Sequence, residues 1–427
     1  LVINSGCANA GMGQQGMDDA KTVCKSLAKH LDINERQVLS FSTGLIMSKL
    51  PVEKIVKAIP NALNDLNENN WFEAAESIMT TDTVPKVYSK IINLYKNNLK
   101  LGSIKSNIQE LIKYSEFYNS SAFGIKDILV RNNQFYVSYI KEHYKDCFST
   151  SILVGELNYS FIEFKDFYSP KKCIEKSNDF FKLHPKDKLV AHQSGGRMII
   201  VDNNLFFSTG EYRYRILAQE PDNDFGKIIS INLKNNSKEI ISIGHRNPQG
   251  LYLSKDLNML FSTEHGPSGG DEINLLDLNT HDNVTANYGW PIASYGRHYF
   301  DNNDDKDKRY ELSPLKKSHS KNGFIEPIKY FDPSVGISQI VGVPEKFFKS
   351  DNNKFLVGTM GNAKKFNKGM ISLFFFEFDK TKKKIVKSEF IPIKSRVRDM
   401  IYIESENIVL LYLENSNALA VLKAKKN

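Results

Sequence analysis

Residues 198–207 read MIIVDNNLFF, two apolar runs joined by an Asp-Asn-Asn turn, and this pattern predicts the architecture of most of the chain. Two short apolar runs joined by a turn rich in Asn and Asp are typical of a β-hairpin. The pattern recurs at residues 128–137, 251–261 and 400–411. The first three turns lie roughly 50 to 70 residues apart, about the length of one four-stranded propeller blade. A β-sandwich also contains hairpins but less readily gives this repeat, so we predict a β-propeller.

The composition of the chain changes near residue 90. Residues 1–90 contain 4 aromatic residues, whereas residues 91–427 contain 44. The first part alternates apolar runs with helical patterns, as α/β proteins do, and the second is mainly β. We predict strands at residues 1–3 and 38–41, and helices over residues 17–31, after residue 51 and over about 70–80. Two domains are expected, over residues 1–90 and 91–427; the repeat is weak at 91–120, which leaves open whether the first blade is complete.

The net charge of +8 does not indicate nucleic-acid binding. Residues 1–90 carry a net charge of −1, which leaves +9 for residues 91–427, where Lys and Arg form only short runs. Such a distribution is typical of a solvated surface. The longest apolar stretch, residues 370–376, is too short to span a bilayer. No signal-peptide pattern is visible after Leu1.

A series of motifs rich in Gly, His and Arg follows along the predicted propeller. The motifs are HQSGGR at 192–197, GHRNPQGL at 244–251, EHGPSGGDEIN at 264–274, NYGWP at 287–291 and RVRDM at 396–400. In a propeller such residues occupy loops around the central channel, where a rigid scaffold positions them for chemistry. Arg246 and the pair Arg396 and Arg398 belong to motifs far apart in the sequence, and their planar guanidinium groups can converge on a polycarboxylate.

Two further features of these motifs point to chemistry. His192 has an ordinary pKa near neutrality and can act as a general base. The Gly-rich loop at 264–272 can turn backbone carbonyl oxygens outward, and Ca²⁺ prefers carbonyl and carboxylate ligands. The alternative for each residue is structural: His192 and the arginines would tie loops together, and Asp271 and Glu272 would fix their own loop or a structural cation.

Taken together, these motifs resemble the glucose/sorbosone dehydrogenase family, the soluble quinoprotein sugar dehydrogenases, over about residues 91–427. That family folds as six-bladed propellers and uses pyrroloquinoline quinone (PQQ) and Ca²⁺. The resemblance implies a six-bladed propeller that oxidises the C1 hydroxyl of an aldose or related sugar by hydride transfer to PQQ. It also implies an external electron acceptor and a periplasmic or secreted location.

The resemblance assigns roles to single residues as well. His192 corresponds to the catalytic base, and Lys364 or Lys365 can fill the position of a family lysine that follows a strand. The remaining assignments are PQQ contacts from Arg246, Asn247, Arg396 and Arg398, and backbone carbonyl ligands to Ca²⁺ from Gly266 and Pro267. Ala191 stands where the soluble glucose enzymes have Asp, so glucose itself is not implied as the substrate.

Residues 1–86 resemble an internal fragment of the ornithine/glutamate N-acetyltransferases of arginine biosynthesis. The matching segments are VINSGCANA at 2–10, STGLI at 42–46 and AAESIMTTDTVPK at 74–86. Thr43 and Gly44 correspond to that family's oxyanion-stabilising pair, but the segment with the nucleophilic Thr is absent, so this truncated α/β fragment is expected to be inactive. GMGQQG at 11–16 fits a dinucleotide pattern, yet the next strand ends in Ser-Thr-Gly and lacks the ribose-binding acid.

Further functions are compatible with the sequence. The propeller could be a non-catalytic module that binds a sugar or a protein, and the first part could retain acetyltransferase activity. Cys147 and Cys173 could form a disulfide, as in an oxidising compartment, or be two free thiols. The propeller family is periplasmic or secreted, whereas the acetyltransferase family is cytosolic. The sugar, the electron acceptor and the oligomeric state are not determined.

Overall fold

The computed structural model of the chain describes residues 1–67, 74, 76–79, 93–98, 102–182, 188–278, 285–299, 311–347, 352–361 and 369–423. The chain forms two compact units, Leu1–Ile91 and Ile92–Asn427, and each is described by itself. Within the described ranges, none of the helices is long and apolar enough to cross a membrane.

The first unit is a small α/β fragment. Its strands β1 (Val2–Cys7) and β2 (Ser40–Leu45) pair in parallel, and its helices are α1 (Gly13–Leu31) and α2 (Val52–Asn64). The helices bury Leu27, Ala28 and Ile59 together with Val38. Ile3 and Phe41 lie opposite each other in the sheet and stay about half exposed. The predicted helix over about 70–80 falls mostly outside the described residues.

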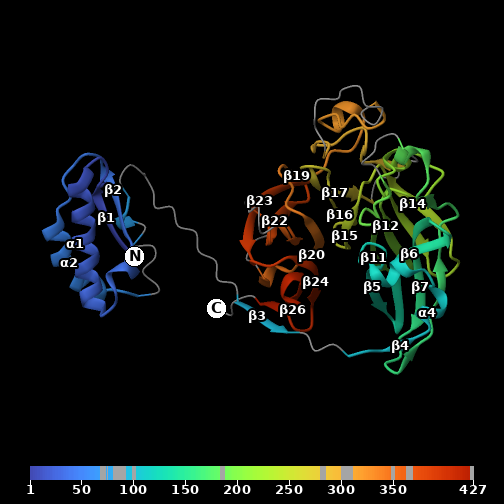
Figure 1. Cartoon of the computed structure of the whole chain (residues 1–427), viewed down its shortest axis with the longest axis horizontal. Helices are drawn as coiled ribbons and strands as arrows, with labels where there is room; N and C mark the ends of the chain where they lie inside the picture. The colour runs from blue at the N-terminus through green and yellow to red at the C-terminus, as the bar shows by residue number, and fades with distance from the viewer. Residues whose placement is uncertain are drawn as a thin grey trace. The chain divides into compact units, whose positions relative to one another are not determined.

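The described part of the second unit is built on five β-sheets, each with four or five strands (Figure 1). The first sheet contains β5 (Ile125–Arg131), β6 (Gln134–Tyr144), β7 (Cys147–Glu156), β9 (Lys165–Tyr168) and β10 (Ile174–Glu175). The second contains β11 (Gly195–Val201), β12 (Asn204–Thr209), β13 (Lys227–Asn232), β14 (Lys238–Ile243) and β18 (Ala286–Asn287). The third contains β15 (Pro248–Ser254), β16 (Met259–Glu264), β17 (Asp271–Asp277) and β19 (Lys329–Phe331).

The remaining two sheets complete the propeller. The fourth contains β20 (Ile337–Val343), β21 (Asn353–Thr359), β22 (Ser372–Asp379) and β23 (Lys384–Pro392). The fifth contains β24 (Val397–Ile403), β25 (Ile408–Leu413) and β26 (Ala418–Lys423), and its outer strand is β3 (Asn93–Asn98) from the start of the unit. The innermost strands β5, β11, β15, β20 and β24 pack against one another in succession. The four predicted hairpins are the first two strands of the first, second, third and fifth sheets.

Apolar faces hold neighbouring sheets together. Tyr136 and Ile152 of the first sheet pack against Phe207 and Ile231 of the second. Another cluster joins the fourth and fifth sheets, where Leu356 and Phe375 pack with Val409 and Leu411. Each such face removes apolar surface from water, which is the main stabilising contribution for sheets that pack face to face.

The prediction of six blades is wrong: the residues that the structure describes form five. The reason is length, because only residues 99–124 separate β3 from β5, and a blade needs roughly 40 to 50 residues. This segment holds the short strand β4 (Lys105–Ser106), which pairs with β8 (Phe161–Ile162), and the short helices α4 (Ile108–Leu111) and α5 (Ser115–Asn119). Ile112, from the same segment, packs on Val137 and Leu153 of the first sheet. The segment thus covers a sheet face against which a further blade would otherwise pack.

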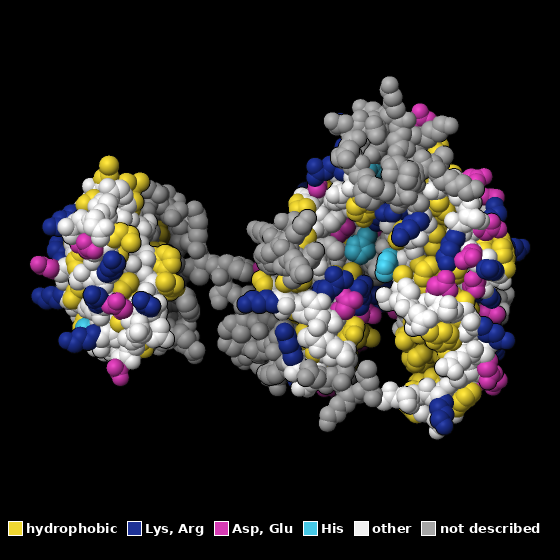
Figure 2. Space-filling model, viewed as in Figure 1, with side chains coloured by type: hydrophobic (Ala, Val, Ile, Leu, Met, Phe, Trp, Pro, Cys, Tyr) yellow, Lys and Arg dark blue, Asp and Glu magenta, His cyan; other side chains and the backbone are white. Residues whose placement is uncertain are grey.

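The ring of sheets is open between the first and fifth sheets. In the described part, β5 and β24 do not pack against each other as the other innermost neighbours do. A cavity of about 520 Å³ is lined by the innermost strands of all five sheets, with Ile128 and Leu129 on the side of the first sheet and Ile401 and Leu419 on the side of the fifth. Figure 2 shows this hollow, with apolar side chains on its walls. The opening exposes 52% of Ile128 and 58% of Ile401.

Cys147 and Cys173 form a disulfide, so the alternative of two free thiols does not apply. The bond joins the first residue of β7 to the residue that precedes β10, and it therefore fixes the edge of the first sheet. Cys7 and Cys24, both in the first unit, are free cysteines.

Candidate active site

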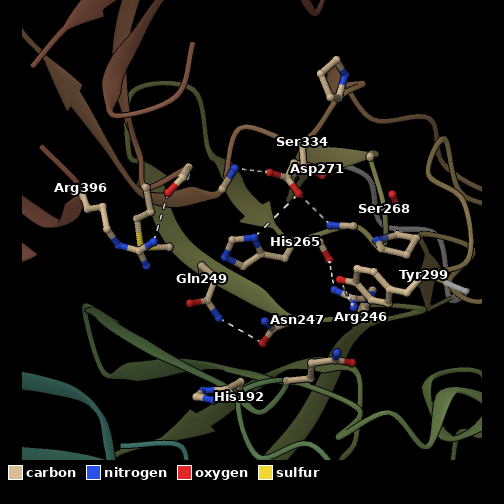
Figure 3. A pocket seen from close by; sticks show the side chains of 18 of the residues that line it. His192, Arg246, Asn247, Gln249, His265, Ser268, Asp271, Tyr299, Ser334 and Arg396 are labelled. Atoms are coloured by element: carbon tan, nitrogen blue, oxygen red, sulfur yellow. Dashed lines mark hydrogen bonds and ion pairs between the residues drawn. The ribbon is translucent and has the colours of Figure 1, made fainter. Parts of the chain in front are cut away.

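A cavity of about 620 Å³ lies among the loops of the second unit (Figure 3). Its volume falls within the range of small-molecule sites. Seven of the residues singled out in the sequence line it: His192, Arg246, Asn247, Gly266, Pro267, Arg396 and Arg398. Lys364 and Lys365 lie outside the described residues. The motifs therefore meet at one place, although they are far apart along the chain.

His192 precedes β11, lines this cavity and is partly accessible to solvent. Among the described residues it makes no hydrogen bond, so both ring nitrogens are available to a ligand. Partial burial lowers the pKa of His192 below its ordinary value, and the positive charges of Lys126 and Arg398 lower it further. The imidazole is therefore neutral near pH 7 and can accept a proton.

Arg246 is fixed by its neighbours on several sides. Its backbone N–H donates to Glu264 Oε2 at 2.8 Å, and its Nη1 donates to the carbonyl oxygen of His265 at 2.9 Å. Its Nη2 donates to Tyr299 Oη at 3.1 Å, and the guanidinium lies 5.3 Å from the centre of the Trp290 ring. Such contacts hold a guanidinium plane in one orientation, which prepares it for a planar anion.

Gln193 and Glu211 support Arg246 from behind. In the amide orientation that satisfies both partners, Gln193 donates to Glu211 Oε1 at 2.9 Å and accepts from Arg246 Nη2 at 3.0 Å. Glu211 is fully buried, and this burial raises its pKa to about 7 in spite of the nearby arginines. Gln193 lies in the HQSGGR motif. Glu211 follows β12 and lies in none of the sequence motifs.

Arg396 and Arg398 share one carboxylate. Arg396 Nε donates to Glu414 Oε2 at 2.6 Å, and Arg398 Nη2 donates to Glu414 Oε1 at 2.7 Å. Burial alone would raise the pKa of Glu414, but the hydrogen bonds and charges of the two arginines lower it below its ordinary value. No sequence motif points to Glu414, because it lies beyond the end of β25, 16 residues after Arg398.

The loop between β16 and β17 can hold a hard cation through its backbone. A side chain at Gly266 would place its Cβ 2.1 Å from the carbonyl oxygen of Gly270, so only glycine fits there. In the part of the chain that the structure describes, the carbonyl oxygens of Gly266 and Pro267 accept no hydrogen bond. These oxygens therefore have no partner among the described residues, and backbone carbonyl oxygens are ligands that Ca²⁺ accepts.

The acidic residues of this loop are engaged in its own structure. Asp271 accepts from the backbone N–H of Gly266 at 3.1 Å and of Gly336 at 2.8 Å. Glu272 is buried and lies 3.3 Å from His319. Among the described residues, no group of three or more His, Cys, Asp or Glu side chains could hold a metal ion.

Comparison with known proteins agrees with this geometry. Residues 90–421 match the glucose/sorbosone dehydrogenase family. The chain belongs to this family. Residues 1–106 match the ArgJ family. Both resemblances inferred from the sequence are therefore confirmed.

Solved structures of two sugar dehydrogenases show the same fold. One is described as a glucose dehydrogenase; it is 21% identical, with a TM-score of 0.55, over 72% of this chain and 83% of that chain. Another is the soluble aldose sugar dehydrogenase of Escherichia coli in the apo form, 21% identical with a TM-score of 0.53, over 71% of this chain and 83% of that chain. At this identity the likeness supports the fold of the second unit.

The first unit has a curated relative, the arginine biosynthesis bifunctional protein ArgJ of Colwellia psychrerythraea. The two are 39% identical over 121 residues, which are 27% of this chain and 28% of the relative. The chain thus spans less than a third of the length of that relative.

Proposed function

We propose that the second unit is a sugar dehydrogenase that oxidises the C1 hydroxyl of an aldose or related sugar with PQQ as its hydride acceptor. Family membership gives the broader class, a sugar dehydrogenase and hence an oxidoreductase. The observation that carries the finer proposal is the convergence of His192 with Arg246, Arg396 and Arg398 around one cavity. A neutral base beside three guanidinium groups suits proton removal next to an anionic cofactor.

The residues around the cavity fit a tricarboxylate quinone. Arg246, Arg396 and Arg398 would bind its carboxylates through planar, charge-assisted hydrogen bonds. Asn247 Oδ1 accepts from the backbone N–H of Gly195 at 3.1 Å, which fixes its amide, and its N–H groups would donate to the cofactor. The carbonyl oxygens of Gly266 and Pro267 would hold the Ca²⁺ ion. PQQ supplies, when bound, an electron-deficient quinone that takes up hydride.

His192 would remove the proton of the C1 hydroxyl. Its lowered pKa keeps the imidazole neutral in the resting site, and the absence of a hydrogen-bond partner among the described residues leaves it free to contact the sugar. After transfer, the protonated ring would lie beside Lys126 and Arg398, so the extra charge is unfavourable and the proton is readily released. An external acceptor would then take the electrons from the reduced cofactor.

We further propose a periplasmic or secreted location for the second unit. The Cys147–Cys173 disulfide supports it, since disulfides persist mainly in oxidising compartments. For the first unit we propose no acyl transfer. Thr43 and Gly44 lie on β2, but no nucleophilic Thr segment of the acetyltransferase type follows in the sequence.

The test adds PQQ and Ca²⁺ to the purified full chain. PQQ binding is followed by its absorbance, and turnover by dye reduction with a panel of aldoses that includes glucose. We expect saturable binding that needs Ca²⁺, and turnover with at least one sugar. Binding without turnover of any sugar would favour a non-catalytic sugar-binding propeller. Absence of PQQ binding would overturn the proposal.

A further inference from the structure

Three residues of the sequence motifs have no part in the proposed chemistry, yet the structure brings them together. Arg197 ends the HQSGGR motif, Gln249 lies in GHRNPQGL, and Asp399 lies in RVRDM. Arg197 and Asp399 line the cavity near the opening between the first and fifth sheets together with Asp127 of β5, whereas Gln249 lines the active-site cavity and contacts Arg197. Four of the five sheets thus contribute to one cluster.

Arg197 is the centre of this cluster. Its Nη1 donates to Asp127 Oδ1 at 3.0 Å and to Asp399 Oδ2 at 3.0 Å, and its Nε donates to the carbonyl oxygen of Gln249 at 3.0 Å. The side chain of Arg197 is 11% exposed, that of Asp127 6%, and that of Asp399 42%. One guanidinium nitrogen therefore bridges carboxylates from both ends of the open ring.

The two carboxylates are themselves immobilised. Asp127 Oδ2 accepts from the backbone N–H of Met198 at 2.7 Å, which ties β5 to β11 a second time. Asp399 Oδ1 accepts from the backbone N–H of Met400 at 2.8 Å. Each carboxylate therefore has a second hydrogen bond besides the one from Arg197, which limits its rotation.

This bridge matters because β5 and β24, unlike the other neighbouring innermost strands, pack only weakly if at all against each other in the described part of the chain. The remaining pairs of neighbouring innermost strands pack side by side, whereas β5 and β24 face each other across a cavity. Arg398 directly precedes Asp399, and His192 precedes Arg197 by five residues on the β11 side. A shift of β24 relative to β11 would therefore move Arg396 and Arg398 away from His192.

We propose that Arg197 is a positioning residue that closes the five-sheet ring through Asp127 and Asp399 and so holds Arg396 and Arg398 opposite His192. The catalytic consequence rests on the proposed function, whereas the closure of the ring does not. A cluster that served stability alone would leave the geometry of the folded protein unchanged when one bond is lost. The positioning role and a purely stabilising role therefore differ in a measurable distance.

The experiment measures that distance by pulsed electron paramagnetic resonance on the full chain. Spin labels are attached to the variants Ile128→Cys and Ile401→Cys, because these two side chains are exposed on opposite sides of the opening. The free cysteines are removed by Cys7→Ser and Cys24→Ser. Asp399→Asn keeps the shape of the side chain and removes its charge, and its partial exposure makes it tolerable for folding. Asp202→Asn is the matched control, since it removes an exposed ion pair with Lys255 at 3.1 Å away from the opening.

We expect a narrow distance distribution in the parent and the control, and a broader one that extends to longer distances in Asp399→Asn. The affinity for PQQ should fall about tenfold in Asp399→Asn, while kcat at saturating PQQ changes little because His192 is intact. Asp399→Glu should largely restore the narrow distance distribution and the affinity for PQQ. Unchanged distances with a lower unfolding midpoint would overturn the proposal. The distance readout does not require PQQ, so a chain that failed to bind it would still test the closure.

Discussion

Arg396 Nε donates a hydrogen bond of 2.6 Å to Glu414 Oε2, and this ion pair lies beside the cavity that His192 also lines. Arg398 binds the other oxygen of the same carboxylate. Glu414 thereby orients two of the three guanidinium groups that we assign to the cofactor. Without it, two flexible cations that repel each other would have to be ordered by the ligand itself.

Glu414→Gln should destabilise the second unit in a pH-dependent way. The arginines hold the pKa of Glu414 below its ordinary value, so the stability that it contributes is present above the unfolded pKa and is lost as pH falls through the lower folded pKa. We expect a loss of about 1 kcal/mol at pH 7, modest because the pair is about one-third exposed, that shrinks as the pH falls through the lowered pKa of Glu414. Urea unfolding at pH 7 and at an acidic pH measures this loss of unfolding free energy. Glu406→Gln on the same hairpin is the control, and a loss that is equal at both pH values would contradict the assignment.

His192→Gln should separate binding from chemistry. Gln keeps polar atoms in place but cannot accept a proton from the substrate, so turnover should fall by about 10²- to 10⁴-fold. The affinity for PQQ should stay within about threefold, since the guanidinium contacts remain. Absorbance titration and dye reduction give the two values. A parallel loss of PQQ affinity would show that His192 binds the cofactor instead of acting as a base.

Lys126→Gln should shift the pH dependence of kcat/KM. Lys126 is one of two cations that lower the pKa of His192, and its own pKa is lowered to about 8, mainly by burial. Loss of this charge raises the pKa of His192. Because the base must be neutral, the acidic limb of the profile should move to higher pH. Lys255→Gln, an exposed lysine, should leave the limb in place; an unmoved limb in Lys126→Gln would rule out this coupling.

The hairpins and the lining of the cavity could be predicted because both depend on local sequence. The turn at residues 202–203 joins β11 to β12 as the apolar runs indicate, and the motif loops follow from Gly, His and Arg at strand ends. The number of blades could not be predicted in this way, because a repeat pattern does not show that residues 99–124 are too short for a blade. Glu414 and Lys126 reach the site only through the pairing of sheets, which no motif encodes.

Loss of the disulfide should destabilise the second unit. The Cys147–Cys173 bond closes a loop with a sequence separation of 26, for which a stabilisation of about 3 kcal/mol is expected. Cys173→Ser should lower the free energy of unfolding by that amount, and a reductant should lower the parent to the same level. The variant itself should not respond to the reductant. If the reductant leaves the parent unchanged, the bond contributes nothing to stability in solution.

Two truncations test what the second unit needs from the start of the chain. A chain that begins at residue 92 keeps β3, which pairs with β26 from Asn93↔Lys423 to Asn98↔Ala418. Since Leu1–Ile91 forms a separate compact unit, this chain should unfold at the same temperature as the second unit of the full chain and bind PQQ equally well.

A chain that begins at residue 99 is the matched comparison, because it differs only by the loss of β3. Its β26 becomes an open edge, so it should lose roughly 3 kcal/mol of stability from the missing ladder and should aggregate more readily. Calorimetry and light scattering measure the two effects. If the chain from residue 92 were destabilised as much as the chain from residue 99, the stabilising contribution would come from the first unit instead of from β3.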